Sequence, residues 1–92
     1  MIEAQHVPFL PRGVRVHWCE VRKAWLLLAP ERAMKLDQIG AAILQAVDGE
    51  RDFAAVVDHL AATFQAPPEQ IAKDAGAFLA DLMNRRMVEV RT

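Results

Sequence analysis

The sequence predicts an α+β domain in which an N-terminal three-stranded antiparallel sheet is followed by a bundle of three helices. Before residue 37, apolar residues alternate with polar ones or run without interruption, as they do in strands. After residue 37, they recur at the spacing of amphipathic helices. The chain has 92 residues, of which 53% are hydrophobic and 25% charged, so we expect one folded domain with a modest core.

Three strands are expected between residues 14 and 36. Residues 14–18 alternate between apolar and polar side chains, which indicates a strand with one buried face. Residues 24–29 are apolar throughout, so this segment should be the central strand, covered on both faces. Pro30 then turns the chain, and residues 33–36 form a third strand that we expect at an edge of the sheet.

Each of the three helices has a start signal. Asp37 and Asp52 can cap the first and second helices, and Pro68 suits the first position of the third. Gly49 can adopt the left-handed conformation that ends the first helix. The third helix should end near residues 84–86. The predicted buried faces are Ile39, Ile43, Ala46 and Val47 in the first helix, Phe53, Val56, Val57, Leu60, Ala61 and Phe64 in the second, and Ile71, Ala75, Phe78, Leu79 and Leu82 in the third.

The ends of the chain are less regular. Residues 1–12 contain two prolines and show no period, so we interpret them as an extended N-terminal arm. Residues 13–92 form a single winged-helix-like domain, in which the second and third helices would be the helix-turn-helix pair. Residues 87–90 either add a last strand or cover the core.

Residues suited to catalysis or metal binding are scarce. His6, His17 and His59 have no partners at metal-ligand spacing, and Cys19 is the only cysteine. A Cys19–His17 nucleophilic pair would lack an orienting carboxylate, and no glycine-rich loop follows a strand. We therefore expect no enzyme activity, cofactor or metal. The lone cysteine and the absence of a long apolar run favour a cytoplasmic protein with no membrane partner.

Charge is distributed unevenly. Residues 1–36 carry a net charge of +3 and residues 37–92 a net charge of −4. The predicted third helix carries as many acidic as basic residues, whereas a helix that reads DNA needs a cationic surface. Nucleic acid is therefore not expected as a partner, although a winged-helix DNA-binding or transcriptional module is kept as the alternative function.

An exposed edge strand has free backbone N–H and C=O groups that can pair with another strand. The strand at residues 33–36 could recruit an extended peptide in this way, or it could pair with a second copy and give a homodimer. We further expect that Met34→Pro would remove a donor from this edge.

Several short segments, in order along the chain, resemble the PqqD family. They are Arg12-Gly13-Val14-Arg15, Leu26-Leu27-Leu28 with Pro30-Glu31-Arg32, Leu36-Asp37, Ile43-Leu44, Asp48-Gly49, and Asp74 with Phe78-Leu79 and Leu82. The resemblance covers roughly residues 8–90. Asp37 stands where the family often has Asn, and either residue can cap a helix.

The resemblance implies a non-catalytic peptide chaperone in the biosynthesis of the redox cofactor pyrroloquinoline quinone (PQQ). Such a protein binds the ribosomal precursor peptide and presents it to a radical S-adenosylmethionine enzyme, which cross-links a Glu and a Tyr side chain of the peptide. The implied fold is a winged-helix relative in which the peptide lies between the third strand and the third helix. The peptide-binding residues would then be Arg32, Ala33, Met34, Lys35 and Leu36 on the strand and Asp74, Ala77, Phe78 and Asp81 on the helix.

Overall fold

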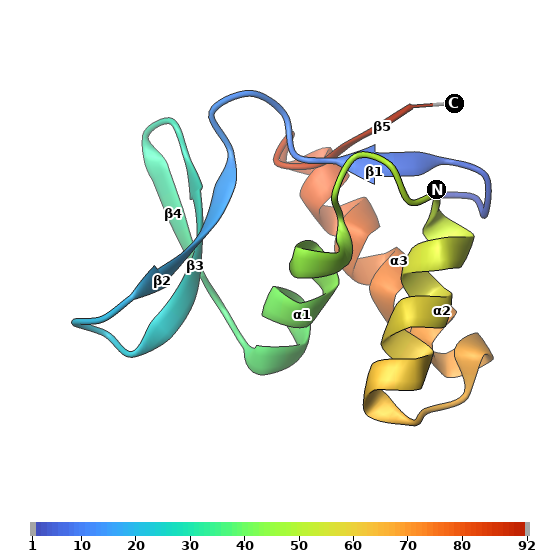
Figure 1. The fold of residues 1–92 in the computed structure, drawn as a ribbon. Helices are drawn as coiled ribbons and strands as arrows, with labels where there is room; N and C mark the ends of the chain where they lie inside the picture. The colour runs from blue at the N-terminus through green and yellow to red at the C-terminus, as the bar shows by residue number, and fades with distance from the viewer. Residues whose placement is uncertain (1, 92) are drawn as a thin grey trace.

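The structure is a computed structural model that describes residues 2–91. Met1 and Thr92, which the predicted arm and domain include, lie outside the described residues. The protein has the predicted α+β, winged-helix-like architecture, with a three-stranded antiparallel sheet followed by three helices. Figure 1 shows the sheet on one side of the molecule, α1 in the middle, and α2 and α3 on the far side.

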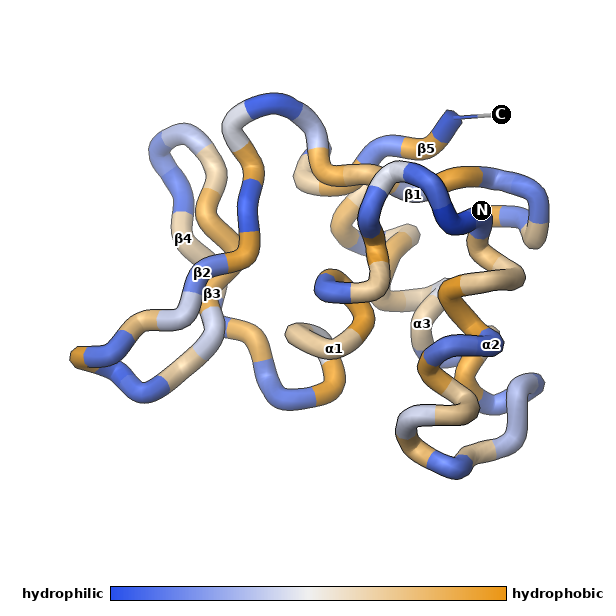
Figure 2. The backbone as a smooth tube through the Cα atoms, viewed as in Figure 1, coloured by the Kyte–Doolittle hydropathy of each residue, from blue (hydrophilic) through white to orange (hydrophobic). Residues whose placement is uncertain are grey.

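The three-stranded sheet contains β2 (Arg15–Cys19), β3 (Ala24–Ala29) and β4 (Arg32–Leu36), in that order. β3 is therefore the central strand, as predicted, and β4 lies at an edge. Polar and apolar residues alternate along β2 (Figure 2), but its expected buried face is only partly covered, since Val16 is half-buried and Trp18 is 38% exposed.

The helices are α1 (Gln38–Ala46), α2 (Phe53–Phe64) and α3 (Pro68–Asn84). The predicted caps are confirmed: the Asp37 and Asp52 carboxylates accept backbone N–H groups at 2.6 and 2.9 Å, and Pro68 occupies the first turn of α3. The predicted left-handed conformation of Gly49 is confirmed, but its predicted place at the end of α1 is wrong. Gly49 does have a positive φ of 80°, but α1 already ends at Ala46 with an extended Val47, so Gly49 turns the loop to α2 instead.

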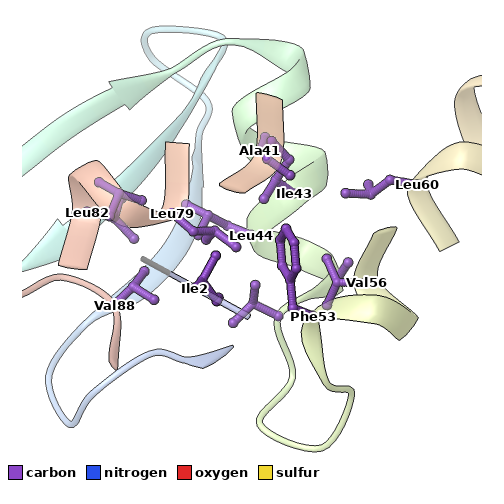
Figure 3. Close-up of a cluster of buried hydrophobic side chains, with 14 of the residues drawn as sticks. Ile2, Ala41, Ile43, Leu44, Phe53, Val56, Leu60, Leu79, Leu82 and Val88 are labelled. Atoms are coloured by element: carbon purple, nitrogen blue, oxygen red, sulfur yellow. The ribbon is translucent and has the colours of Figure 1, made fainter. Parts of the chain in front are cut away.

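One hydrophobic core joins the sheet to all three helices, and Figure 3 shows side chains from α1, α2 and α3 converging in it. Leu27, Leu79 and Leu82 have no exposed surface. The predicted helix faces are confirmed except at two positions, with Ile71 and Phe78 half-buried against the core. Ile39 is 58% exposed and Phe64 is 38% exposed, because both side chains line an open cavity between the three helices.

The two ends of the chain meet in a small second sheet. β1 (Val7–Phe9) pairs antiparallel with β5 (Glu89–Arg91), across the top of the molecule in Figure 1. Ile2 is 8% exposed and belongs to the core. The carbonyl groups of Ala4 and His6 accept the backbone N–H groups of Ala54 and Phe53, respectively. Residues 4–6 therefore provide hydrogen-bond acceptors for N–H groups at the start of α2, which have no partner within the helix.

No helix among residues 2–91 has the length and apolar character needed to cross a bilayer.

Candidate functional site

The free edge of β4 is set by its register against β3. Arg32 pairs with Ala29 across a two-residue loop, so these two residues form a hydrogen-bonded pair, and such pairs recur at every second position. Met34 therefore exchanges its backbone hydrogen bonds with β3. The N–H and C=O groups of Ala33 and Lys35 point away from β3, and no other strand within residues 2–91 pairs with them.

This register corrects the expectation for Met34→Pro. Proline at Met34 would remove a hydrogen bond inside the sheet, not a donor at the edge. The donors available to an added strand belong to Ala33 and Lys35.

The side chains of β4 alternate between two faces. Leu36 is 5% exposed and Met34 is half-buried, and both pack against the core. Ala33 and Lys35 are exposed on the opposite face, and Arg32 is exposed beside the turn. A strand added to β4 would place alternate side chains on the same two faces, one toward the helices and one toward solvent.

Phe78 of α3 lies against the start of α1. A Cβ atom built on Gly40, in the first turn of α1, would lie 3.2 Å from Cζ of Phe78 and 3.1 Å from the Asp37 carboxylate. The absence of a side chain at Gly40 therefore lets the Phe78 ring lie against the start of α1, just after β4 ends at Leu36.

The other three predicted helix residues differ in their surroundings. The carboxylate of Asp74 accepts the amide of Gln70 at 3.0 and 3.1 Å. Asp81 forms an exposed ion pair with Arg85 at 3.1 Å. Ala77 does not lie with Asp74: it lines a cavity on the arm side of α3, together with Ile2 and Phe53.

A second cavity lies between the three helices and has a volume of about 230 Å³. Its lining is almost wholly apolar. The polar residues in it are Gln70 and Asp74, which bond each other. The full lining is Ile39, Ile43, Leu60, Phe64, Ala66, Gln70, Ile71, Asp74 and Ala75. We call this the interhelix cavity.

Sequence reasoning missed the interhelix cavity because it assigned Ile39 and Phe64 to the core. One signal was available. Ile39 is the second residue of α1 and Phe64 is the last of α2, and a helical stripe that continues to a helix end can extend beyond the partner that buries it.

Neither metal-ligating side chains nor groups with a shifted pKa indicate another functional site among residues 2–91. Among residues 2–91 no cluster of His, Cys, Asp or Glu could hold a metal ion. The pKa of Asp48 is lowered, because its carboxylate accepts the backbone N–H groups of Arg51 and Glu50, both at 2.9 Å. Asp48 lies in the α1–α2 loop, where this arrangement stabilises the turn.

Comparison with known protein families shows to which family this chain belongs. The family described as Coenzyme PQQ synthesis protein D (PqqD) matches residues 24–88, which span the sheet from β3 onward and all three helices. The chain belongs to the PqqD family. The family resemblance of the sequence is thereby confirmed.

Individual PqqD proteins match over nearly the whole chain. A PqqA binding protein from Rhizobium meliloti (strain 1021) is 47% identical over 90 residues, covering 98% of this chain and 92% of the relative. The solution structure of the PqqD truncation of Methylobacterium extorquens PqqCD is 39% identical with a TM-score of 0.83, over 97% of this chain and 95% of that one. That protein is described as a functional, stand-alone recognition element for ribosomally synthesized and post-translationally modified peptides.

The crystal structure of PqqD from Xanthomonas campestris is similar but superposes less well. It is 36% identical with a TM-score of 0.59, over 85% of this chain and 87% of that one.

Proposed function

We propose that this protein binds the precursor peptide PqqA as an added strand on β4 and acts in PQQ biosynthesis as a non-catalytic peptide chaperone. The observation that carries the proposal is the free edge of β4, where the backbone groups of Ala33 and Lys35 face outward. The naming of the 47%-identical relative as a PqqA binding protein supports the choice of peptide.

The peptide-contacting residues in this proposal are those expected from the sequence, apart from Ala77. Arg32 and Lys35 supply positive charge along the edge, and Met34 supplies an adaptable apolar contact on the inner face. Ala33 and Leu36 are the further proposed contacts on the strand, and Asp74, Phe78 and Asp81 are the proposed contacts on α3, whereas Ala77 lines the cavity on the arm side of that helix.

Backbone pairing alone does not account for tight binding. Two outward residues offer up to about four hydrogen bonds, each worth about 0.5–1.5 kcal/mol net. A micromolar complex needs about 8 kcal/mol. Side chains of the peptide must therefore supply a comparable share by burying apolar surface against the inner face of β4 and the helices.

The test is calorimetric titration with a synthetic PqqA peptide from Rhizobium meliloti, the source of the 47%-identical relative. We expect a one-to-one complex whose affinity changes little with salt. An affinity that falls steeply with salt for duplex DNA, with no binding of PqqA, would instead favour the alternative DNA-binding module.

We also propose that the bound peptide is presented to a radical S-adenosylmethionine enzyme. Strand addition holds a short segment extended and leaves its flanks free for the enzyme, which would cross-link a Glu and a Tyr side chain. Co-elution of this protein, PqqA and the enzyme as a ternary complex tests this step. Equal cross-linking rates with and without this protein would contradict it.

The same edge can pair with a second copy, so a homodimer would compete with the peptide. Sedimentation across a concentration series, with and without PqqA, tests this. We expect the peptide to shift any dimer toward the monomer, and a dimer that binds PqqA unchanged would contradict a shared edge.

A further inference from the structure

Two apolar residues that the helical pattern assigns to the core are instead exposed, and both line the interhelix cavity. Ile39 is 58% exposed and Phe64 is 38% exposed. The floor between them is apolar, with buried Ile43 and Leu60 (Figure 3) contributed by α1 and α2. Apolar groups left open beside an apolar floor favour an apolar occupant.

The size of the interhelix cavity limits that occupant. Its volume of about 230 Å³ is below the range of roughly 300–1,000 Å³ of most small-molecule sites. An apolar cavity of about 150 Å³ can hold a benzene ring, so this one has room for a single leucine or phenylalanine side chain. Its two polar residues, Gln70 and Asp74, bond each other and leave few groups to orient a polar cofactor.

The position of the interhelix cavity connects it to the β4 edge. Leu36 ends β4, and Ile39 follows it by three residues, so their Cα atoms are at most about 11 Å apart. An extended peptide advances about 3.3 Å per residue. A chain paired with Ala33 and Lys35 that continues past Leu36 therefore reaches the cavity within about three residues.

The charge of Asp74 at the rim of the interhelix cavity is a second constraint on what binds there. Asp74 has no cation within ion-pair distance among residues 2–91, whereas Asp81 on the same helix is paired with Arg85. A basic residue of the peptide would find its complement at Asp74.

We propose that the interhelix cavity holds one leucine- or phenylalanine-sized side chain of the precursor peptide, just outside the segment paired with β4, and that an adjacent lysine or arginine of the peptide pairs with Asp74. This inference rests on the proposed function. It divides recognition into two parts: β4 fixes the peptide backbone, and the cavity reads one apolar side chain.

The experiment is calorimetry with synthetic Rhizobium meliloti PqqA and matched variants. Ile39→Asp places a charge at the rim of the cavity, and Val21→Asp makes the same change at a side chain that is 93% exposed on the β2–β3 turn. We expect Ile39→Asp to weaken binding about 10- to 100-fold, the effect of losing one large buried apolar side chain. Val21→Asp should stay within about twofold, and Asp74→Asn should weaken binding about two- to fivefold.

An alanine scan of the large apolar residues of PqqA identifies the occupant. At one peptide position, alanine should weaken binding to the wild-type protein by about the same factor as Ile39→Asp does. The same peptide substitution should weaken binding to Ile39→Asp hardly at all. If Ile39→Asp does not fold, methyl NMR of the wild-type protein replaces it, and the shifts of Ile39 and Ile43 should change on titration.

The outcomes separate the two claims. Failure of wild-type protein to bind PqqA overturns the proposed function. Binding that is lost in Lys35→Pro but unchanged in Ile39→Asp keeps the proposed function and overturns the cavity. If Ile39→Asp changes self-association but not the affinity for PqqA, the cavity proposal is also overturned, because a second copy of the protein then fills the cavity.

Discussion

Replacing Lys35 by proline tests strand addition at a single backbone group. In the β3–β4 register, the N–H of Lys35 points away from β3, so proline removes an edge donor and no hydrogen bond within the sheet. The residue before it, Met34, is already in a strand, which is the conformation that a following proline favours. We therefore expect Lys35→Pro to fold.

The expected loss of affinity follows from that one donor. A hydrogen bond contributes about 0.5–1.5 kcal/mol, and a buried acceptor left without a partner costs about 1–3 kcal/mol. The unpaired acceptor sets the cost of losing the donor, and about 1–3 kcal/mol corresponds to a roughly 5- to 150-fold weaker complex with PqqA. Isothermal calorimetry with the Rhizobium meliloti peptide measures it directly.

Two matched variants isolate the cause. Lys35→Ala removes the charged side chain and keeps the N–H, so it should weaken binding no more than about fivefold. Met34→Pro breaks the pairing with β3, so it should lower the melting temperature, which Lys35→Pro should leave within a few degrees. Equal affinities of Lys35→Pro and Lys35→Ala for PqqA would refute strand addition on β4.

Three further predictions concern how the site is held in place. Asp37→Ala removes the cap of α1 and should lower the free energy of unfolding in urea by about 1 kcal/mol. Gly40→Ala forces a methyl group against Phe78 and should cost about 1–3 kcal/mol, part of which Phe78→Leu restores. Asp48→Ala should lower the melting temperature at pH 7. The lowered pKa of Asp48 means that this difference is present above its ordinary value of 3.8 and disappears as the pH falls through the folded-state value.

Each of these three has a result that would contradict it. Unchanged urea unfolding in Asp37→Ala would mean that the cap does not stabilise α1. An equal cost of Gly40→Ala in the Phe78→Leu background would mean that the two side chains do not meet. A melting difference for Asp48→Ala that persists at pH 2 would place its cause outside the carboxylate.

The fold was largely predictable because its signals are local. The Asp37 and Asp52 caps and the proline at the start of α3 are each set by a few neighbouring residues, and the structure has all of them. The apolar run of β3 likewise identified the central strand.

The details of the candidate site depend on packing between distant segments, and periodicity does not contain that information. Ile39 and Phe64 follow the apolar stripe of their helices, but both line the interhelix cavity instead of packing in the core. Which backbone groups of β4 face outward depends on the length of the loop to β3. The alternation of side chains alone therefore does not show that the N–H of Met34 faces β3.

Amide hydrogen exchange of the complex with PqqA tests the central claim most directly. β2 is the other edge of the same sheet, so one experiment compares the two edges. Strand addition on β4 predicts that exchange at Ala33 and Lys35 slows at least about tenfold on binding while the edge amides of β2 do not change. Slower exchange along β2, with Ala33 and Lys35 as in the free protein, would contradict it.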